Sequence, residues 1–167
     1  SDFCKAIAAA VLGDATAVEM VDLETADRFT ALQNGSIDVL VRNTTWTATR
    51  DGSEAATFLQ PNFYDGQGMM VAANSGYSSV SQMKGAIICV SKGTTTEGNA
   101  ALESSRLGLN WEVRSFDDTD LILEAFIAGQ CDGWSSDVSQ LTGFRSAYPE
   151  GAAALAILPE VFSKEPL

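Results

Sequence analysis

Histidine is absent from the 167 residues, and cysteine occurs only three times. Without histidine the chain cannot form a Ser-His-Asp triad, a Cys-His pair or a zinc site that mixes His with Cys, which excludes much of hydrolase chemistry. The three cysteines lie 85 and 42 residues apart with no CxxC pair, so they cannot form a Cys-only zinc knuckle or a thioredoxin-type redox centre. We therefore expect no catalytic residue, no metal and no cofactor.

Basic residues are also scarce, because 10 Lys and Arg stand against 22 Asp and Glu for a net charge of −12. A surface with this balance repels phosphate backbones and anionic lipids, so no nucleic-acid partner is expected. The longest apolar run, Ala6–Leu12, is far shorter than the roughly 20 residues of a membrane span, and we expect no transmembrane segment or signal peptide. The lack of an initiator methionine indicates a processed product or a fragment.

The sequence does contain a core-forming composition, 46% hydrophobic, arranged in alternating helix and strand patterns. Such alternation predicts an α/β fold with mainly parallel strands. We expect helices to begin near Ser1 or Asp2, Thr25, Gly93, Thr119 and Asp137. The segments predicted as strands are 19–23, 37–41, 69–73, 86–90, 112–116, 133–136 and 155–158.

Two segments of the chain repeat one pattern, in which a capping threonine is followed at +7, +10 and +13 by a large apolar residue, a glycine and an aspartate. The two sets are Thr25, Leu32, Gly35 and Asp38, and, 94 residues later, Thr119, Phe126, Gly129 and Asp132. Each set describes a capped helix that ends at glycine and a strand that delivers a polar residue, Asn43 or Asp137. The repeat favours two similar lobes, with chance use of caps and glycines as the alternative.

Candidate ligand-binding residues follow three of the predicted strands. The segment Arg42–Arg50 holds two arginines and four threonines, which suits an anion, although an exposed and solvated loop is the alternative. The turn at Lys92–Glu97 would present helix N–H groups to an anion, but a plain helix start capped by Thr94 is the simpler interpretation. The carboxylate of Asp137 would accept a ligand ammonium or only cap the next helix.

Seven short stretches, in order along the whole chain, resemble one protein family. They are Asp2-Phe-Cys-Lys-Ala, Arg28-Phe-Thr-Ala-Leu, Arg42-Asn-Thr-Thr-Trp-Thr, Tyr64-Asp-Gly-Gln-Gly, Gly93-Thr-Thr-Thr-Glu, Gly129-Gln-Cys-Asp and Ser163-Lys-Glu-Pro-Leu. The family they resemble is the solute-binding proteins of bacterial polar amino acid ABC transporters, and within it the general L-amino-acid-binding branch. The resemblance implies a type II periplasmic-binding-protein fold, in which two doubly wound lobes joined by a two-strand hinge close on a ligand.

The resemblance also implies how the chain is divided. Residues 1–66 would form part of lobe one, residues 67–160 lobe two, and residues 161–167 the start of the hinge return to lobe one. Family members have a strand before the first helix and a longer return segment, so lobe one is expected to be truncated at both ends. An incomplete lobe exposes apolar surface, which would allow non-native self-association.

Carried onto this sequence, the resemblance implies a set of ligand-binding residues. They are Asn43, Thr45, Arg50, Thr95, Thr96 and Asp137. Arg50 would bind the α-carboxylate of a free L-amino acid and Asp137 its ammonium group, with the other four adding contacts. The implied function is that of a non-enzymatic periplasmic protein that delivers amino acids to the membrane permease of an ABC transporter.

The same resemblance implies a disulfide, because Cys89 and Cys131 fall in or beside strands that one lobe can make neighbours, in an oxidising periplasm. Cys4 would be left over. Two other functions stay open. One is a cyclohexadienyl or arogenate dehydratase-like enzyme on the same fold, which would need Asp137 or Glu97 as an acid. The other is the ligand-binding module of a sensor.

Overall fold

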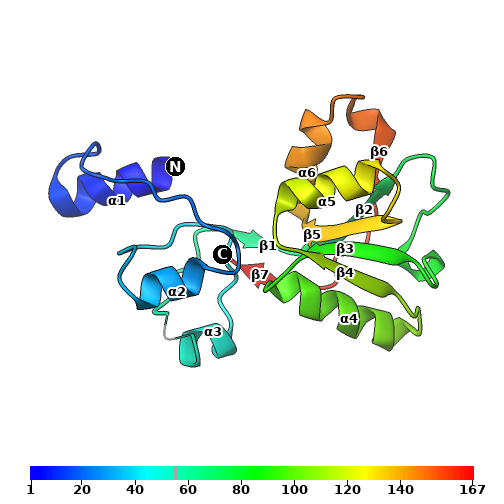
Figure 1. The fold of residues 1–167 in the computed structure, drawn as a ribbon, viewed down its shortest axis with the longest axis horizontal. Helices are drawn as coiled ribbons and strands as arrows, with labels where there is room; N and C mark the ends of the chain where they lie inside the picture. Colours follow the sequence, from blue (N-terminus) through cyan, green and yellow to red (C-terminus); the bar gives the residue numbers. More distant parts are fainter. Residues whose placement is uncertain (55) are drawn as a thin grey trace.

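The computed structural model describes residues 1–54 and 56–167 of this α/β protein (Figure 1). Its helices are α1 (Asp2–Leu12), α2 (Arg28–Gln33), α3 (Ala48–Gly52), α4 (Thr95–Leu107), α5 (Thr119–Ile127) and α6 (Val138–Ala147), with 3-10 turns η1 (Val80–Gln82) and η2 (Ala152–Ala154). The strands are β1 (Tyr64–Asp65), β2 (Gln67–Ala72), β3 (Ile87–Ser91), β4 (Glu112–Phe116), β5 (Gly133–Asp137), β6 (Leu155–Ile157) and β7 (Glu165–Pro166). In the described ranges, no helix combines the length and apolarity needed to cross a membrane.

A five-stranded sheet in the order β4-β3-β5-β2-β6 forms the larger part of the molecule. Strand β3 pairs in parallel with β4 and β5, whereas β2 is antiparallel to both β5 and β6. Strands β3, β4, β5 and β6 therefore run in one direction, as the alternation of helices and strands in the sequence predicts. Strand β2 runs in the opposite direction, which that alternation does not predict. The reversal arises in the connection from β2 to β3, which contains only the short turn η1 and no crossover helix, so the chain turns back and β3 runs opposite to β2.

Helices cover both faces of this sheet, so alternate residues of a strand enter different cores. Met69 and Val71 of β2 pack in one cluster with Ala100 of α4. Met70, between them, lies in the other cluster with Trp134 and with residues of α5 and α6. Helix α4, which joins β3 to β4, lies over one face, and α5, which leads back to β5, lies over the other, so the direction of winding changes at β3 (Figure 1).

The predicted disulfide between Cys89 and Cys131 is confirmed. It joins Cys89 of β3 to Cys131, which lies two residues before the start of β5, with the two Cα atoms 5.8 Å apart. Both sulfur-bearing residues are buried in the cluster under α5 and α6. Cys4, on α1, is a free cysteine.

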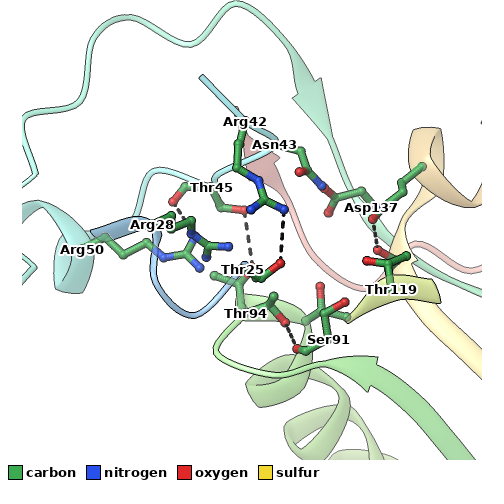
Figure 2. Close-up of a pocket in the computed structure, with 14 residues that line it drawn as sticks. Thr25, Arg28, Arg42, Asn43, Thr45, Arg50, Ser91, Thr94, Thr119 and Asp137 are labelled. Atoms are coloured by element: carbon green, nitrogen blue, oxygen red, sulfur yellow. Dashed lines mark hydrogen bonds between the residues drawn. The ribbon is translucent and has the colours of Figure 1, made fainter. Parts of the chain in front are cut away.

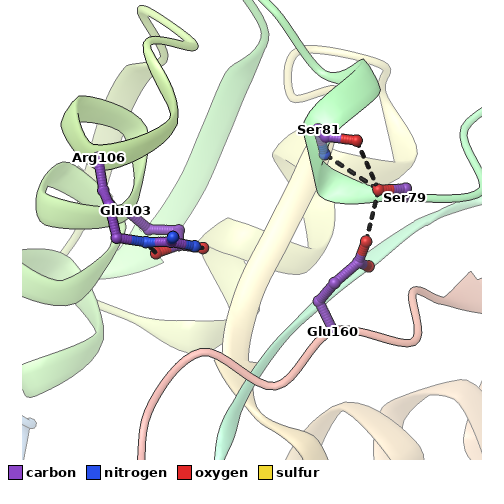
Figure 3. Close-up of polar contacts among 5 residues, drawn as sticks. All are labelled: Ser79, Ser81, Glu103, Arg106 and Glu160. Atoms are coloured by element: carbon purple, nitrogen blue, oxygen red, sulfur yellow. Dashed lines mark hydrogen bonds and ion pairs between the residues drawn. The ribbon is translucent and has the colours of Figure 1, made fainter.

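Helix α4 begins where the sequence predicts. The Thr94 hydroxyl accepts a hydrogen bond from Glu97 N at 3.3 Å, and the Glu97 carboxylate accepts from Gly93 N at 3.0 Å, so both side chains cap the first turn. Further along α4, the buried carboxylate of Glu103 accepts two hydrogen bonds of 2.6 and 2.7 Å from the guanidinium of Arg106 (Figure 3). The charged side chains Glu97, Glu103 and Arg106 of this helix therefore all have hydrogen-bond partners.

A separate two-stranded sheet joins the five-stranded part to the N-terminal part. Strand β1 pairs antiparallel with β7, and Figure 1 shows this pair between the larger sheet and helices α2 and α3. Trp46 N, in the N-terminal part, donates to Pro166 O at 2.8 Å. On the other side, Ser79 Oγ donates to Glu160 at 2.5 Å and fastens the segment before β7 to η1 (Figure 3). Both parts of the molecule are thus bonded to the same return segment.

Two strands predicted for the N-terminal part are wrong. Residues 19–23 and 37–41 have no strand structure, although both contain apolar runs. A strand needs a hydrogen-bonded neighbour, and neither sheet of the described chain includes these segments. The side chains of Met20, Val21 and Val39 accordingly stay exposed.

Two predicted helix caps are also wrong. Helix α2 begins after Asp27 rather than Thr25, and α5 begins after Asp118 rather than Thr119. The Asp118 carboxylate accepts from Asp120 N at 2.8 Å, since aspartate caps a helix at least as well as threonine. Both threonines are consequently left to make other contacts, and both line the cavity described next.

Candidate functional site

A small cavity of about 40 Å³, partly open to solvent, lies between the N-terminal part and the five-stranded part (Figure 2). All of the residues that line it are polar. They are Thr25, Arg28, Arg42, Asn43, Thr45, Arg50, Ser91, Thr94, Thr95, Thr96, Thr119, Ser136, Asp137 and Gln140. The structure therefore brings all six predicted ligand-binding residues to one place.

Two neighbouring parallel strands end at this cavity. Strand β3 ends at Ser91 and leads into Thr95 and Thr96, which open α4, while β5 ends at Ser136 and Asp137. Ligands of open α/β sheets bind at the carboxyl ends of strands, at the point where the winding changes, and β3 is that point here. The turn at Lys92–Glu97 therefore both starts α4 and forms part of the cavity wall, because Thr95 and Thr96, which follow the capping Thr94, line the cavity.

Arg50 is buried in the N-terminal wall of the cavity. Its position is fixed locally, since the Thr47 hydroxyl caps α3 by accepting from Arg50 N at 3.1 Å. The guanidinium donates from Nη1 to Thr45 O at 2.9 Å and lies 5.4 Å from the centre of the Phe29 ring. Burial lowers the pKa of Arg50, and the Glu165 carboxylate opposes this. An arginine stays charged at neutral pH all the same, so the group can receive an anion.

Asp137 faces the cavity from the other wall and is 5% exposed. It occupies the N-cap position of α6 but makes no capping hydrogen bond, so the interpretation as a plain cap is wrong. Asp65 of β1 takes that role by accepting from Ser139 N at 3.3 Å and from the Ser139 hydroxyl. The Asp137 carboxylate accepts instead from Asn43 Nδ2 at 3.2 Å. Burial raises its pKa to about 6, with the Asn43 hydrogen bond opposing the shift.

Glu165 of β7 is a buried residue that the sequence reasoning did not place in the site. Its carboxylate accepts from Thr45 Oγ1 at 2.5 Å and from Thr95 Oγ1 at 3.2 Å. Asn99 Nδ2, at 3.1 Å, and the Ser163 hydroxyl are its other partners. Glu165 thus bonds to one predicted site residue from each part of the molecule. Its only signal in the sequence is its place in the last of the seven family-like stretches.

Two further arginines line the cavity, and neither was among the predicted site residues. Arg28, at the start of α2, is 3% exposed, donates from Nη2 to Gly93 O at 3.4 Å and has an Nε atom without a partner in the described structure. Arg42 is more exposed and donates to Leu23 O at 3.0 Å and to Thr25 Oγ1 at 3.2 Å. Arg42 opens the loop identified as suitable for an anion, whereas nothing in the sequence marked Arg28 as buried.

The charge of the cavity is opposite to the charge of the chain. Three arginines and one aspartate line it, whereas the whole chain has a net charge of −12. Within the described residues no group of His, Cys, Asp or Glu side chains is arranged to hold a metal ion. The arrangement can therefore bind an anion at the arginines and a cation at Asp137, with hydroxyl and amide groups between them.

Comparison with known proteins gives relatives along the whole chain. The glutamate/glutamine/aspartate/asparagine-binding protein of Rhodobacter capsulatus is 47% identical over 164 residues, which are 98% of this chain and 48% of the relative. The general L-amino acid-binding periplasmic protein of Rhizobium johnstonii is 43% identical over 166 residues, which are 99% of this chain and 48% of the relative. The chain spans about half the length of the curated relatives it matches.

Solved structures give the same fold. A periplasmic binding protein of an ABC transporter from Brucella ovis, with glutathione bound, is 42% identical and matches with a TM-score of 0.93 over 99% of this chain and 52% of that one. An ancestral arginine-binding protein bound to glutamine is 29% identical, with a TM-score of 0.83 over 99% of this chain and 69% of that one. These likenesses confirm the predicted fold of type II periplasmic binding proteins. Together with the match of residues 1–106 to "Bacterial extracellular solute-binding proteins, family 3", they show that the chain belongs to that family.

Proposed function

We propose that this protein is a periplasmic solute-binding protein that captures free L-amino acids by hinge closure and delivers them to the permease of an ABC transporter. The observation that carries the proposal is the pair of buried, oppositely charged groups, Arg50 and Asp137, that face one polar cavity from its two walls. A free amino acid has the complementary pair of charges. The amino-acid-binding names of two relatives support the same conclusion.

The roles of the site residues follow from their chemistry. Arg50 would receive the α-carboxylate through its free guanidinium N–H groups, and Asp137 would receive the ammonium group. Because both groups are buried, each charge–charge contact is made in a medium that screens it weakly. The hydrogen-bonding groups of Asn43 and Thr45, on one wall, and of Thr95 and Thr96, on the other, would complete the shell around the ligand.

Hinge closure is the proposed motion. Residues 1–66 would form one lobe, residues 67–160 the second, and residues 161–167 the return across the hinge, with β1 and β7 as the two connecting strands. Opening would separate Asn43 from Asp137 and Thr45 from Thr95, whose hydroxyl oxygens lie 3.4 Å apart. A ligand bonded to both walls would therefore favour the closed form.

An enzyme related to cyclohexadienyl dehydratases would need a protonated acid at the cavity. The raised pKa of Asp137 is compatible with that need, whereas Glu97 caps α4 and is not among the cavity residues. The relatives are named as binding proteins, which supports binding over catalysis. Prephenate and arogenate nevertheless belong in the test, because turnover of either would decide for the enzyme.

The test is a thermal-shift screen of the full-length protein against the twenty L-amino acids, prephenate and arogenate. A ligand at 100 times its Kd should stabilise the protein by about 2.7 kcal/mol. Arg50→Ala should abolish the shift, while Arg114→Ala, which removes an arginine on β4 outside the cavity, should leave it unchanged. A protein that responds to no amino acid would overturn the proposal.

A further inference from the structure

The cavity holds more positive charge than one amino-acid backbone can use. If Arg50 pairs with the α-carboxylate and Asp137 with the ammonium group, the guanidinium groups of Arg28 and Arg42 remain. Among the described residues, none of the three arginines has a carboxylate within the 4.0 Å of an ion pair. The lining itself contains a single carboxylate, that of Asp137.

Arg28 gives the clearest evidence that the cavity arginines lack hydrogen-bond acceptors. This guanidinium is 3% exposed, yet it has one long hydrogen bond of 3.4 Å and an Nε atom with no partner in the described structure. Leaving a buried N–H group of a charged side chain without an acceptor is costly. Because water does not solvate the group, an anionic acceptor in the cavity would gain more from it than from an exposed arginine.

The arginines also repel one another. Arg28 and Arg50 lie against the same ring, 5.0 and 5.4 Å from the centre of Phe29. Burial lowers the pKa of Arg28 to about 10, and the positive charges of Arg50 and Arg42 contribute to this. An added negative charge between them would relieve this repulsion, and the backbone of a zwitterionic ligand supplies only one.

Two carboxylates near the lining do not fill that need. Glu165 is held by hydrogen bonds from Thr45, Thr95, Asn99 and Ser163 in the hinge. Glu54 opposes the lowering of the pKa of Arg28, but no ion pair joins the two in the described structure. The surplus of positive charge is therefore local to Arg28 and Arg42.

We infer that Arg28 and Arg42 form a second carboxylate subsite beside Arg50, so that the preferred ligands are amino acids with an ionised side-chain carboxylate. Figure 2 shows these guanidinium groups directed toward one space, with Thr25 beside them. The inference rests on the proposed function, because it assigns the α-carboxylate to Arg50. Thr25 accepts a hydrogen bond from Arg42 Nη2, so its own hydroxyl hydrogen is free to point at the carboxylate.

This subsite separates an acid from its amide. The side-chain carboxylate of glutamate offers acceptors to both guanidinium forks. Glutamine has the same shape but directs an NH₂ group, which only donates, at groups that also only donate. A site built for one pattern of hydrogen bonds rejects the wrong pattern strongly, because its buried groups are left unpaired.

Isothermal titration of the full-length protein with L-glutamate and L-glutamine tests the inference without changing the protein. We expect glutamate to bind at least about tenfold more tightly at pH 7.5 and low salt, and aspartate to exceed asparagine in the same way. Arg42→Gln should bring the glutamate-to-glutamine ratio within about threefold by weakening glutamate alone. Arg114→Gln removes the same charge outside the cavity and should keep the wild-type ratio.

Arg28 is buried, so its variant is the conservative Arg28→Lys, which keeps the charge and loses the fork. It should lower the glutamate-to-glutamine ratio with an unfolding transition close to that of the wild type. Equal affinity of the unmodified protein for glutamate and glutamine would overturn the inference and leave the proposed function intact, and so would an equal loss of both in Arg42→Gln. Failure to bind any amino acid would overturn both. If a variant fails to fold, the ratio of the unmodified protein decides.

Discussion

Residues 67–160 and residues 1–54 use their apolar side chains in different ways. The first region builds a five-stranded sheet with a buried cluster on each face, and side chains such as Met69 and Ile88 have no exposed surface. In the second region, large apolar side chains of the two segments without strand structure, such as Val21 and Val39, remain exposed. Apolar runs of similar composition therefore become strands only where a neighbouring strand can accept their hydrogen bonds.

The two regions also differ in charge at the point where they meet. All three cavity arginines belong to residues 1–54, whereas Asp137 and the threonines of the α4 turn belong to residues 67–160. The less packed region thus contributes the positively charged groups of the cavity, and the well-packed region contributes the negatively charged group. Ligand affinity and fold stability should consequently respond to different substitutions.

The largest effect expected is on the core of residues 67–160. Trp134 is 1% exposed and its ring centre lies 4.6 Å from that of Phe144. Trp134→Ala should lower the free energy of unfolding by about 3–5 kcal/mol, because it leaves a cavity. Val39→Ala, at a side chain that is 50% exposed, should change it by at most about 0.5 kcal/mol. Urea unfolding measures both, and similar losses in the two variants would remove the contrast between the regions.

The disulfide is the next strongest difference. Replacing Cys89 and Cys131 together with serine opens a loop of 42 residues, and the free energy of unfolding should fall by about 2–4 kcal/mol. Cys4→Ser is the matched control and should change it by at most about 0.5 kcal/mol, since Cys4 is free. Titration of the unfolded, unreduced protein should find one thiol, and three would contradict the assignment.

These contrasts mark what the sequence could predict of the fold. Strands β3, β4 and β5 were predicted to within about one residue at each end, because turn or capping residues bound each segment, and each has a partner in the same region. The strands expected at 19–23 and 37–41 could not be judged in that way, because the local pattern does not say whether a neighbour exists. The reversed direction of β2 depends on the chain connection, which a residue pattern does not carry.

The site was predictable where a charged residue follows a predicted strand and the family resemblance implies a ligand charge for it. Arg50 and Asp137 are at such positions, and both line one cavity. Glu165 and Arg28 were missed because their importance comes from burial, and burial depends on which distant segments pack over them. Acidic and basic side chains are usually exposed, so composition argued against both.

Glu165 offers a way to sharpen the comparison, because it bonds to both regions. Glu165→Gln keeps the size of the side chain but replaces one acceptor of the carboxylate with an NH₂ group facing hydroxyl or amide partners. Hydrogen bonds to a charged group contribute about 1.5–3 kcal/mol, so ligand affinity should fall by roughly tenfold or more. Glu160→Gln is the control, since Glu160 bonds to Ser79 within residues 67–160 and should leave affinity unchanged. If Glu165→Gln, like Glu160→Gln, leaves ligand affinity unchanged, Glu165 contributes only to the stability of the fold.

The smallest effect expected is on pH dependence, and it should come from the well-packed region alone. The pKa of Asp137 is raised to about 6, mainly by burial, whereas the cavity arginines of residues 1–54 keep their charge at every pH between 5 and 8. A ligand ammonium needs the ionised carboxylate, so binding at lower pH requires loss of a proton. One pH unit below the pKa about ten in eleven carboxyl groups are protonated, so the Kd for glutamine should be about tenfold weaker at pH 5 than at pH 7.5.

The stability of the unliganded protein should change in the opposite direction, and this separates a titrating Asp137 from general acid sensitivity. A carboxyl group whose pKa is higher in the folded state than its model value of 3.8 favours folding most below that value, and the contribution is lost as the pH rises through about 6. Asp137→Asn should remove both trends together, so that the difference between wild type and variant isolates this residue from the other acids. Glutamine is the right ligand for this measurement because its side chain does not titrate. An unchanged pH profile in Asp137→Asn would place the titrating group elsewhere and remove Asp137 from the ammonium subsite.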